Sequence, residues 1–339
     1  MDTIMVIYKS EQAMDNLEKL AKKKKRKNLF KTVSISILSF LVIVAVAYKG
    51  IQAMVSRQAQ TAMDEFETLS EIAYPNISVD SLYFKPDTLL TGVFHADRFK
   101  DIDGVMVEYG DYEEAYTPFA TYYDLTQDSP AFTTDGAYDR GSRTRLPMFF
   151  NVNKVEDDGY VFIVTKDEIG LVKEMENQLV EVALTFDKDY TYAEIQEMLP
   201  DNLKVNFYWI GTDSDLDTAS FRVDQLYGLK SPELTASDEE NEILGWAEMM
   251  IQNMQAVVDS DSTFYTGDYD HKTELKNYIE KYGEIDFTNQ EEVEQMTFAG
   301  VILTGKAENF EQLESAEWLY ASSIGASVQN QPYYDLEAE

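Results

Sequence analysis

Residues 32–48, TVSISILSFLVIVAVAY, form an apolar run without a charged side chain, and Lys31 and Lys49 bound it. As a helix rising about 1.5 Å per residue, this run spans about 25 Å, slightly less than the roughly 30 Å hydrocarbon core of a bilayer. The two lysines can extend their ammonium groups to the headgroups and make up the difference. A spanning segment must be helical, because lipid offers backbone N–H and C=O groups no hydrogen-bond partner. The run therefore predicts a single transmembrane helix over residues 32–48.

Charge changes sharply across this run. Residues 1–31 contain 9 Lys or Arg against 4 Asp or Glu, whereas residues 49–339 contain the remaining 19 against 58. Basic residues beside a span are retained in the cytoplasm, so we expect the N-terminus inside the cell membrane and about 290 residues outside it. The residues that determine this topology are Lys22, Lys23, Lys24, Lys25, Arg26, Lys27, Lys31 and Lys49.

A cleavable signal peptide is the alternative interpretation of the same run. Ala45, Val46 and Ala47 fit the A-x-A pattern of a cleavage site. The 31 residues before the run are, however, very long for a signal sequence. The length therefore favours an uncleaved anchor and a single-pass membrane protein.

Composition limits the chemistry of the outer region. The chain has no cysteine, which excludes disulfides, thiol nucleophiles, thiolate metal sites and iron–sulfur clusters. Its net charge of −34 opposes direct nucleic-acid binding, because phosphate contacts require clustered Lys and Arg. The one basic cluster adjoins the predicted span, where it acts as a topology signal and can contact anionic lipid. Aromatic residues make up 13% of the chain, which indicates folded domains rather than disorder.

Residues 1–31 are predicted to form a cytoplasmic basic arm that contains a short amphipathic helix over residues 8–21. Ser10 is a suitable N-cap for this helix. An isolated helix of this length is marginal in water, so its apolar stripe needs a surface to pack on, either a partner protein or lipid. The candidate partner-binding residues of the stripe are Met14, Leu17, Leu20 and Ala21.

Beyond the span, apolar residues continue at helical spacing as far as Tyr74. This pattern predicts a helical stalk over residues 49–74, which Pro75 ends. Over residues 75–165 the pattern changes to short strand runs separated by Asp, Gly and Pro, which indicates a β-rich membrane-proximal domain. The strand runs are SLYF, TGVFHADRF, GVMVEYG, FATYYDL and LPMFFNV.

Residues 166–339 are predicted to form a C-terminal α+β domain with two strand–helix–strand units. In the first unit, residues 179–186 alternate as a strand with Val180, Val182, Leu184 and Phe186 on one face. A helix follows, and a second strand contains Val205, Phe207 and Trp209. The helix is opened by the capping box Thr191-x-x-Glu194 and stopped by Pro200.

The second unit repeats this scheme later in the chain. Residues 298–304 form a strand run, Asn309-x-x-Gln312 opens a short helix with Leu313 inward, and residues 318–328 form the next extended run. Two such units indicate an α+β extracytoplasmic region of ferredoxin-like kind, in which a sheet carries helices on one face.

Two stronger helical patterns lie between these units. The first is opened by the capping box Ser237-x-x-Glu240 and runs to about Val258. Its apolar face, which includes two methionines that fit core filling better than a ligand surface, contains Ile243, Ala247, Met250, Met254 and Val257. The second pattern is defined by Leu275, Tyr278, Ile279 and Tyr282.

The sequence GVILTGKA at residues 300–307 matches seven of the eight positions of a phosphate-binding P-loop. Its four intervening residues are Val-Ile-Leu-Thr, which is typical of a buried strand and not of a loop whose backbone N–H groups cradle phosphate. Ala307 also lacks the hydroxyl group that binds Mg²⁺ in a P-loop. We therefore predict a strand here and no nucleotide cofactor.

Asp213, Asp215 and Asp217 resemble the start of a calcium-binding EF-hand loop whose twelfth position is Asp224. The sixth position is Thr218 where the motif requires glycine, and the twelfth is Asp where it has Glu. The pattern favours a solvated acidic loop over a metal site and leaves weak Ca²⁺ binding open.

His95 and His271 are far apart in the sequence and lack the i, i+4 spacing of a zinc-binding helix. No G-x-S-x-G motif supplies a nucleophile. The sequence therefore predicts no catalytic residue, no metal ligand and no cofactor, and it disfavours an extracellular hydrolase.

Two stretches of the outer region resemble the C-terminal domain of sigma-factor regulators of Gram-positive bacteria. They are LVEVALTFDKDYTYAEIQEMLPDNLKVNFYWIGT and FAGVILTGKAENFEQLES, the latter followed by SSIGASV. The basic KKKKRKNLFKT, the span, the stalk, YTPFATYYDL and RTRLPMFFNV are similar to the companion N-terminal domain. The resemblance covers nearly all of residues 22–328. It implies a membrane-bound anti-sigma factor that holds an extracytoplasmic-function sigma factor at the inner membrane face until an envelope signal arrives.

The resemblance implies a sigma factor as the cytoplasmic partner, and the apolar run predicts membrane lipid around the span. Anti-sigma domains normally wrap a sigma factor with several helices, whereas only 31 residues precede the span here. Three alternatives follow: a minimal binding segment, a segment that requires a second membrane subunit, or no sigma contact at all. The last corresponds to a cell-envelope binding or scaffolding protein with a simple membrane anchor.

Overall fold

A computed structural model describes residues 2–124, 127–129, 146–154, 165–212, 221–231, 242–260, 264–266 and 269–331 of the 339-residue chain. The chain divides into two compact units, Met1–Arg57 and Gln58–Glu339.

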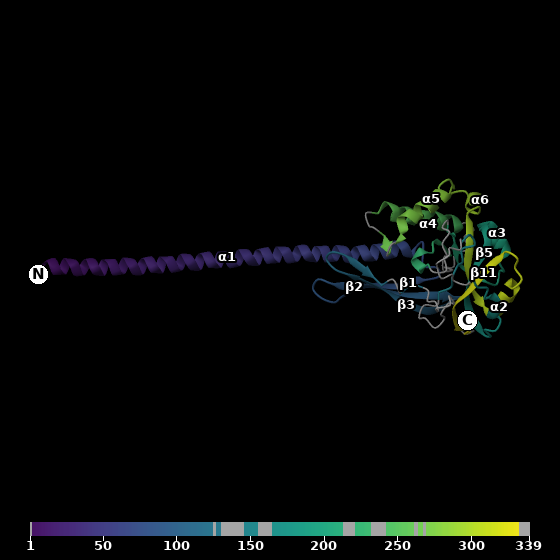
Figure 1. Ribbon diagram of the computed structural model, residues 1–339, viewed down its shortest axis with the longest axis horizontal. Helices are drawn as coiled ribbons and strands as arrows, with labels where there is room; N and C mark the ends of the chain where they lie inside the picture. The colour runs from purple at the N-terminus through teal and green to yellow at the C-terminus, as the bar shows by residue number, and fades with distance from the viewer. Residues whose placement is uncertain are drawn as a thin grey trace, which may run out of the picture. The chain divides into compact units, whose positions relative to one another are not determined.

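Helix α1, Asp2–Ser70, is continuous from the arm to the end of the stalk (Figure 1). Its arm is rich in Lys, Leu and Ala, which favour helix, and i, i+4 ion pairs join Asp15 to Lys19 and Glu18 to Lys22 at 2.6 Å. The prediction of a separate helix capped by Ser10 is therefore wrong, since Ser10 lies inside α1. The stalk helix also ends at Ser70, a few residues before the predicted stop at Pro75.

Residues 14–50 of α1 are exposed throughout, and the apolar side chains of the predicted span are not covered by protein. By length and composition, α1 is the one helix among the described residues that could cross a membrane.

The second unit contains an antiparallel sheet in the order β1-β2-β3-β4 (Figure 1). Its strands are β1 Ser78–Pro86, β2 Gly92–Ile102, β3 Val105–Tyr116 and β4 Thr121–Tyr123. Four of the five predicted strand runs overlap these strands. The fifth, LPMFFNV, is not a strand. Residues 146–150 are buried but irregular, and the Phe150 N–H donates to Thr185 Oγ1 at 3.0 Å instead of joining a ladder.

A second sheet has five strands in the order β11-β5-β10-β6-β7, and all neighbours are antiparallel. The strands are β5 Gln178–Thr191, β6 Lys204–Trp209, β7 Gly228–Lys230, β10 Thr297–Lys306 and β11 Leu319–Gln329. Both predicted strand–helix–strand units are present. The helix of the first is α3, Tyr192–Met198, and the element of the second is the 3₁₀ helix η3, Ala307–Leu313.

The two predicted helix starts differ in outcome. At α3 the capping box is confirmed, because Glu194 N–H donates to Thr191 Oγ1 and Thr191 N–H donates to the Glu194 carboxylate. At η3 the prediction is wrong, because Asn309 lies inside the helix and Lys306 occupies the cap. The Asn309 amide instead donates to Asn202 O at 2.8 Å, in the turn before β6.

The remaining elements frame this sheet. They are α2 Ile169–Val172, η2 Val223–Gln225, α4 Glu242–Asp259, β8 Tyr265–Thr266, β9 Tyr269–Asp270, α5 His271–Tyr282 and α6 Gln290–Val293. Helices α4 and α5 pack against each other (Figure 1). The apolar face predicted for α4 is buried, and so are Leu275, Tyr278 and Tyr282 of α5. The predicted cap at residues 237–240 lies outside the described residues.

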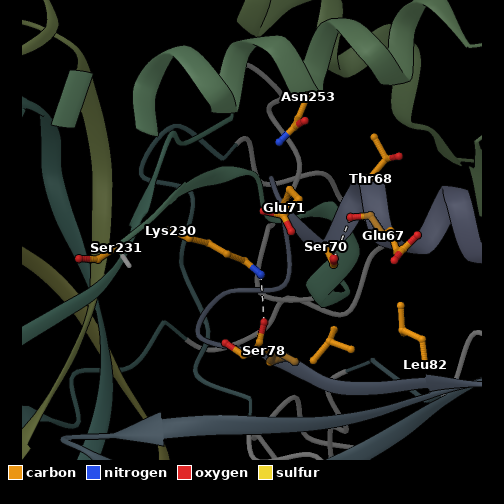
Figure 2. A pocket seen from close by; sticks show the side chains of 11 residues that line it. Glu67, Thr68, Ser70, Glu71, Ser78, Leu82, Lys230, Ser231 and Asn253 are labelled. Carbon is orange, nitrogen blue, oxygen red and sulfur yellow. Dashed lines mark hydrogen bonds between the residues drawn. The ribbon is translucent and has the colours of Figure 1, made fainter. Parts of the chain in front are cut away.

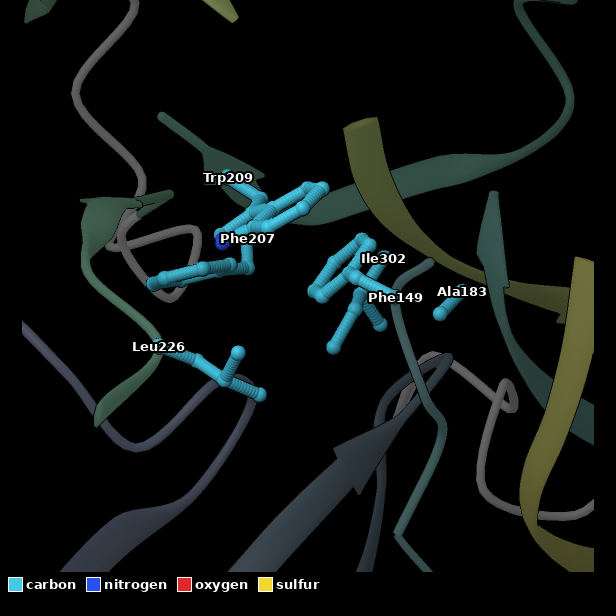
Figure 3. Close-up of a cluster of buried hydrophobic side chains, with 6 residues drawn as sticks. All are labelled: Phe149, Ala183, Phe207, Trp209, Leu226 and Ile302. Carbon is cyan, nitrogen blue, oxygen red and sulfur yellow. The ribbon is translucent and has the colours of Figure 1, made fainter. Parts of the chain in front are cut away.

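Both faces of the five-stranded sheet are covered. On one face α3 packs on the sheet, since Gln196 Nε2 donates to Tyr208 OH at 2.7 Å. On the other face Phe149 stacks on Trp209 with ring centroids 4.7 Å apart. Figure 3 shows the cluster that Phe149 completes, which consists of Phe149, Ala183, Phe207, Trp209, Leu226 and Ile302. The irregular segment over residues 146–150 thus covers this face of the sheet through Phe149.

Candidate functional site

The chain that leaves α1, residues 71–77, is held tightly by its surroundings, and we call it the exit segment. Every residue from Ile72 to Ile77 is buried. Tyr74 and Asn76, on either side of Pro75, have φ of 58° and 51°. A left-handed backbone costs a residue other than glycine about 1–3 kcal/mol. Such strain persists only where the surroundings hold it.

Backbone hydrogen bonds attach the exit segment to the chain around β7. The Tyr74 N–H donates to Val223 O at 3.0 Å, and the Gly228 N–H donates to Ile72 O at 2.9 Å. Position 228 has room only for glycine, because a Cβ there would lie 2.1 Å from Tyr208 O. The end of α1 is therefore connected directly to the edge of the five-stranded sheet.

Three side chains, Asn76, Lys100 and Glu181, form what we call the buried lock. The Lys100 ammonium donates to both Glu181 carboxylate oxygens, at 3.0 and 2.7 Å, and Asn76 Nδ2 donates to Glu181 Oε1 at 2.8 Å. Lys100 is 1% exposed and Glu181 is not exposed at all. The lock joins the exit segment to β2 of the first sheet and β5 of the second.

Strand β11 provides a further hydrogen bond and the space that the Glu181 carboxylate of the lock requires. The Ala326 N–H of β11 donates to Glu181 Oε2 at 2.9 Å, and Gly325 leaves the room, because a Cβ there would lie 2.2 Å from that oxygen. Burial lowers the pKa of the Lys100 ammonium, and the Glu181 carboxylate opposes this shift. A buried ion pair with its remaining hydrogen bonds satisfied resists separation.

The polar contacts continue from the lock along the five-stranded sheet. Asn206 Nδ2 donates to Asn76 Oδ1 at 2.9 Å, and Thr304 Oγ1 donates to Asn206 Oδ1 at 2.7 Å. Lys204 pairs with Asp101, the neighbour of Lys100 in β2. Strands β6 and β10 are therefore linked to the exit segment by side chains as well as by packing.

A second buried ion pair lies beside Tyr74. The Arg98 guanidinium binds the Asp128 carboxylate through two parallel hydrogen bonds of 2.9 and 3.0 Å. It also lies 5.9 Å from the centre of the Tyr74 ring and 4.9 Å from that of Tyr109. Tyr123 OH donates to Asp128 at 2.6 Å. The Tyr74 ring is thus held between an arginine and the aromatic face of the first sheet.

The last turns of α1 insert an aromatic ring into the same face. The Phe66 ring centroid lies 4.3 Å from that of Tyr112, 5.6 Å from Tyr74 and 5.7 Å from Phe94. Phe66 is 2% exposed. A shift or rotation of α1 within this unit would separate these rings, so the position of α1 is coupled to the exit segment.

A cavity of about 530 Å³ opens beside the end of α1. Figure 2 shows Glu67 and Ser70 of α1 and Glu71 of the exit segment on one side, with Lys230 extending from β7 and Asn253 from α4. The Lys230 ammonium donates to Ile77 O at 3.0 Å, and burial lowers its pKa to about 8, which the Glu71 carboxylate opposes. The cavity therefore borders the exit segment directly.

The sequence-predicted site residues are in the other unit. Met14, Leu17 and Leu20 are 67%, 65% and 61% exposed, and Ala21 is exposed beside them. The basic residues Lys22–Lys27, Lys31 and Lys49 are exposed as well. The partner-binding role of the stripe and the topology role of the basic residues stay predictions.

The chemical motifs weighed from the sequence have structural roles where they are described. Residues 300–306 belong to β10, whose Val301, Ile302 and Leu303 are fully buried, so the predicted strand is confirmed. Residues 213–218 of the EF-hand-like stretch lie outside the described residues. Asp224 does not face solvent, because its carboxylate accepts from Arg222 at 2.7 Å and is 2% exposed.

The two histidines also have local partners. His95 Nδ1 lies 3.2 Å from Glu113, and His271 Nδ1 lies 2.6 Å from Tyr227 OH in the core. Burial lowers the pKa of His271, which favours its neutral form. Among the described residues, no group of three or more His, Asp or Glu could hold a metal ion.

Two family descriptions match the chain. "Sigma factor regulator N-terminal" matches residues 18–107, and "Sigma factor regulator C-terminal" matches residues 172–326. The chain belongs to the sigma factor regulator family. No curated protein and no solved structure matches it. The partner implied by the family is a sigma factor, and the family is regulatory. The two matched regions of this regulator meet at the buried lock, because Asn76 and Lys100 lie in the first and Glu181 in the second.

Sequence reasoning missed the lock. Glu181 is the one charged residue in LVEVALTF, and an acidic side chain in a buried strand is a signal for a buried partner. Nothing in the sequence marks Lys100 as that partner, because it lies in a charged stretch, RFKDID, that resembles the exposed end of a strand.

Proposed function

We propose that this sigma factor regulator is a membrane-anchored anti-sigma factor, a negative regulator of an extracytoplasmic-function sigma factor, with an outer sensor region. The observation that carries the proposal is the continuity of α1, which joins the exposed arm stripe, the apolar run and the stalk in one helix that leads into the exit segment. The matched N-terminal family region begins at residue 18, beside the basic cluster, and includes the whole apolar run.

In this proposal α1 crosses the cell membrane once. The basic residues that flank residues 32–48 on the arm side favour a cytoplasmic N-terminus. Ala45 to Ala47, the alternative cleavage site, lie in the interior of α1. The second unit is then the extracytoplasmic part, and the regulator has a sensing role and no enzymatic one.

The outer part is proposed to consist of two domains, residues 75–165 and 166–339, of which the second is ferredoxin-like. The order β11-β5-β10-β6, with α3 and η3 as the connections of the two units, supports this class, and β7 extends the sheet by one edge strand. The buried lock and the Arg98–Asp128 pair would then couple the two domains to α1, so that an envelope signal which loosens them changes α1.

Two kinds of partner are proposed for α1. A sigma factor is proposed to bind the stripe that contains Met14, Leu17, Leu20 and Ala21, with lipid around residues 32–48. Either the stripe suffices for this binding, or a second membrane subunit completes the binding site. The rival is an envelope scaffolding protein that uses α1 only as an anchor.

Deletion of the gene tests the sign of regulation. If the regulator restrains its sigma factor, the promoters that depend on this sigma factor are expected to become constitutively active in the deletion strain. Transcript levels measured with and without the sigma-factor gene would check this. Lower promoter activity in the deletion strain would indicate a positive regulator, and unchanged activity would favour the scaffold.

Topology has its own test. A periplasm- or surface-active reporter fused after Glu339 is expected to be active, and the same reporter fused before residue 2 is expected to be inactive, because the basic arm stays inside. The full-length chain should stay in the membrane fraction. Recovery of a soluble chain that begins near Tyr48 would show that the run is a cleaved signal peptide.

A further inference from the structure

Two hairpin turns meet at one end of the first sheet. The register pairs Pro86 with Gly92, Gly92 with Tyr116, and Tyr116 with Thr121. The turns over residues 87–91 and 117–120 therefore leave the sheet from a single row of residues. We call these two turns the hairpin tips.

Each hairpin tip presents one large apolar side chain to the outside. Leu89 is 73% exposed and Phe119 is 78% exposed. Exposed aromatic residues lie just behind the tips, with Phe84 at 40% and Tyr122 at 61%. The nearest charged residues in sequence are Lys85 and Asp87, one of each sign.

Hydrogen bonds within the tips pair at least six of their eight backbone N–H groups. Thr88 and Asp87 N–H groups donate to Thr91 O at 3.1 and 3.0 Å, and the Leu90 N–H donates to Thr88 Oγ1 at 3.1 Å. In the other tip, the Thr117 N–H donates to Ala120 O at 2.9 Å, and the N–H groups of Phe119 and Ala120 donate to Thr117 Oγ1. Turns that pair most of their N–H groups internally can enter a poorly hydrated layer at a lower cost than open loops.

The direction of α1 in this unit shows at which end of the first sheet the chain enters the unit. Its last residues lead through the exit segment to Ser78, which pairs with Phe99, whereas Phe66 contacts Phe94, closer to the tips. Lower-numbered residues of α1, such as the fully buried Ala62, therefore lie still closer to the tips. The chain enters the second unit at the end where the tips project.

The apolar run ends close to this point in the chain. Nine residues separate Tyr48 from Gln58, a distance of at most about 15 Å as a helix or about 35 Å fully extended. A bilayer around residues 32–48 is then no farther than this from the start of the second unit.

We propose that the hairpin tips dock into the outer surface of the lipid bilayer, with Leu89 and Phe119 inserted among the headgroups and upper acyl chains. This inference rests on the proposed single-span anchoring. Apolar and aromatic side chains beside a satisfied backbone suit this layer, where Tyr and Phe are stable at the boundary between water and lipid. The contact would fix the second unit against the membrane and make it respond to motion of α1.

Site-directed labelling tests the proposal on the full chain, which has no native cysteine. Leu89→Cys and Phe119→Cys carry an environment-sensitive fluorophore in nanodiscs with or without brominated lipid. Leu171→Cys, 51% exposed on α2, is the matched surface control, and Ile43→Cys in the apolar run reports anchoring. The labels at 89 and 119 are expected to emit at shorter wavelength and to lose at least half their intensity to brominated lipid, while the label at 171 does neither.

The controls separate the two proposals. Quenching at 43 without quenching at 89 and 119 would overturn the docking and leave the anchoring intact. Quenching at 89 and 119 without quenching at 43 would support docking and overturn the anchoring. A blue shift at the tips without lipid quenching would show that protein covers them and would also overturn the docking. With Leu89→Asp and Phe119→Asp together, a label at Tyr122→Cys is expected to lose its quenching.

Discussion

Replacing Lys100 with methionine is expected to lower the free energy of unfolding of the second unit by about 3–5 kcal/mol. The substitution keeps the length and apolar stem of the side chain but removes the ammonium group that donates to both Glu181 oxygens. The Glu181 carboxylate would then be buried with hydrogen bonds from Asn76 and Ala326 but without a cation. An uncompensated buried charge is far more destabilising than a lost surface contact.

A double variant separates this cause from lost packing. Adding Glu181→Gln to Lys100→Met removes the stranded charge and keeps an oxygen that can accept from Asn76 or Ala326. Most of the lost stability is therefore expected to return, since a buried pair replaced by neutral groups is often close to neutral in effect. The control is Lys173→Met, which breaks the 3.1 Å ion pair between Lys173 and Glu314. The Lys173 side chain is half exposed. The control substitution is expected to cost less than about 1 kcal/mol.

Tryptophan fluorescence during denaturant unfolding measures all three variants. Trp209, Trp246 and Trp318 are the only tryptophans of the chain, and all lie in the second unit, so the signal is specific to it. Equal losses for Lys100→Met and for the double variant would mean that shape, and not charge, holds the lock together. A loss for Lys100→Met no larger than that for Lys173→Met would mean that water reaches the pair.

The elements that could be predicted are those with local signals. The capping box from Thr191 to Glu194 predicts the start of α3 from four consecutive residues. The alternation with period two in LVEVALTF predicts a strand. The alternation assigned Val180, Val182, Leu184 and Phe186 to a buried face, which is correct. It could not show that the other face is buried too, because the layer that covers it comes from residue 149 and from the exit segment.

The elements that could not be predicted depend on distant partners. Asn309 has the residue type of a cap, but Asn202 competes for its amide and η3 begins earlier. Pro75 marks a helix end, yet α1 stops at Ser70 because the chain must turn to place Tyr74 beside Val223. For the arm, the sequence predicts a partner-binding stripe, and this stays a prediction that the next experiment tests.

The double substitution Leu17→Asp with Leu20→Asp is expected to release the sigma factor and to make its regulon constitutively active. Both leucines are more than half exposed on α1 and have no covering protein among the described residues. An apolar side chain contributes about 1.5–3 kcal/mol when it is fully buried in a groove, so the loss of two should weaken binding by more than about tenfold.

Two controls on the same helix identify the cause. Lys19→Glu changes the arm by the same two charges on the opposite face, and it should leave binding and regulon output near the wild-type level. Changing Lys22, Lys23 and Lys24 to glutamine, with insertion verified, should also change the output little, whereas a stripe that packs on lipid would depend on these cations. Promoter activity and pull-down of the sigma factor by the full chain provide the two readouts. If the aspartate pair leaves both at the wild-type level, the arm is only an anchor, and the scaffolding function replaces the anti-sigma one.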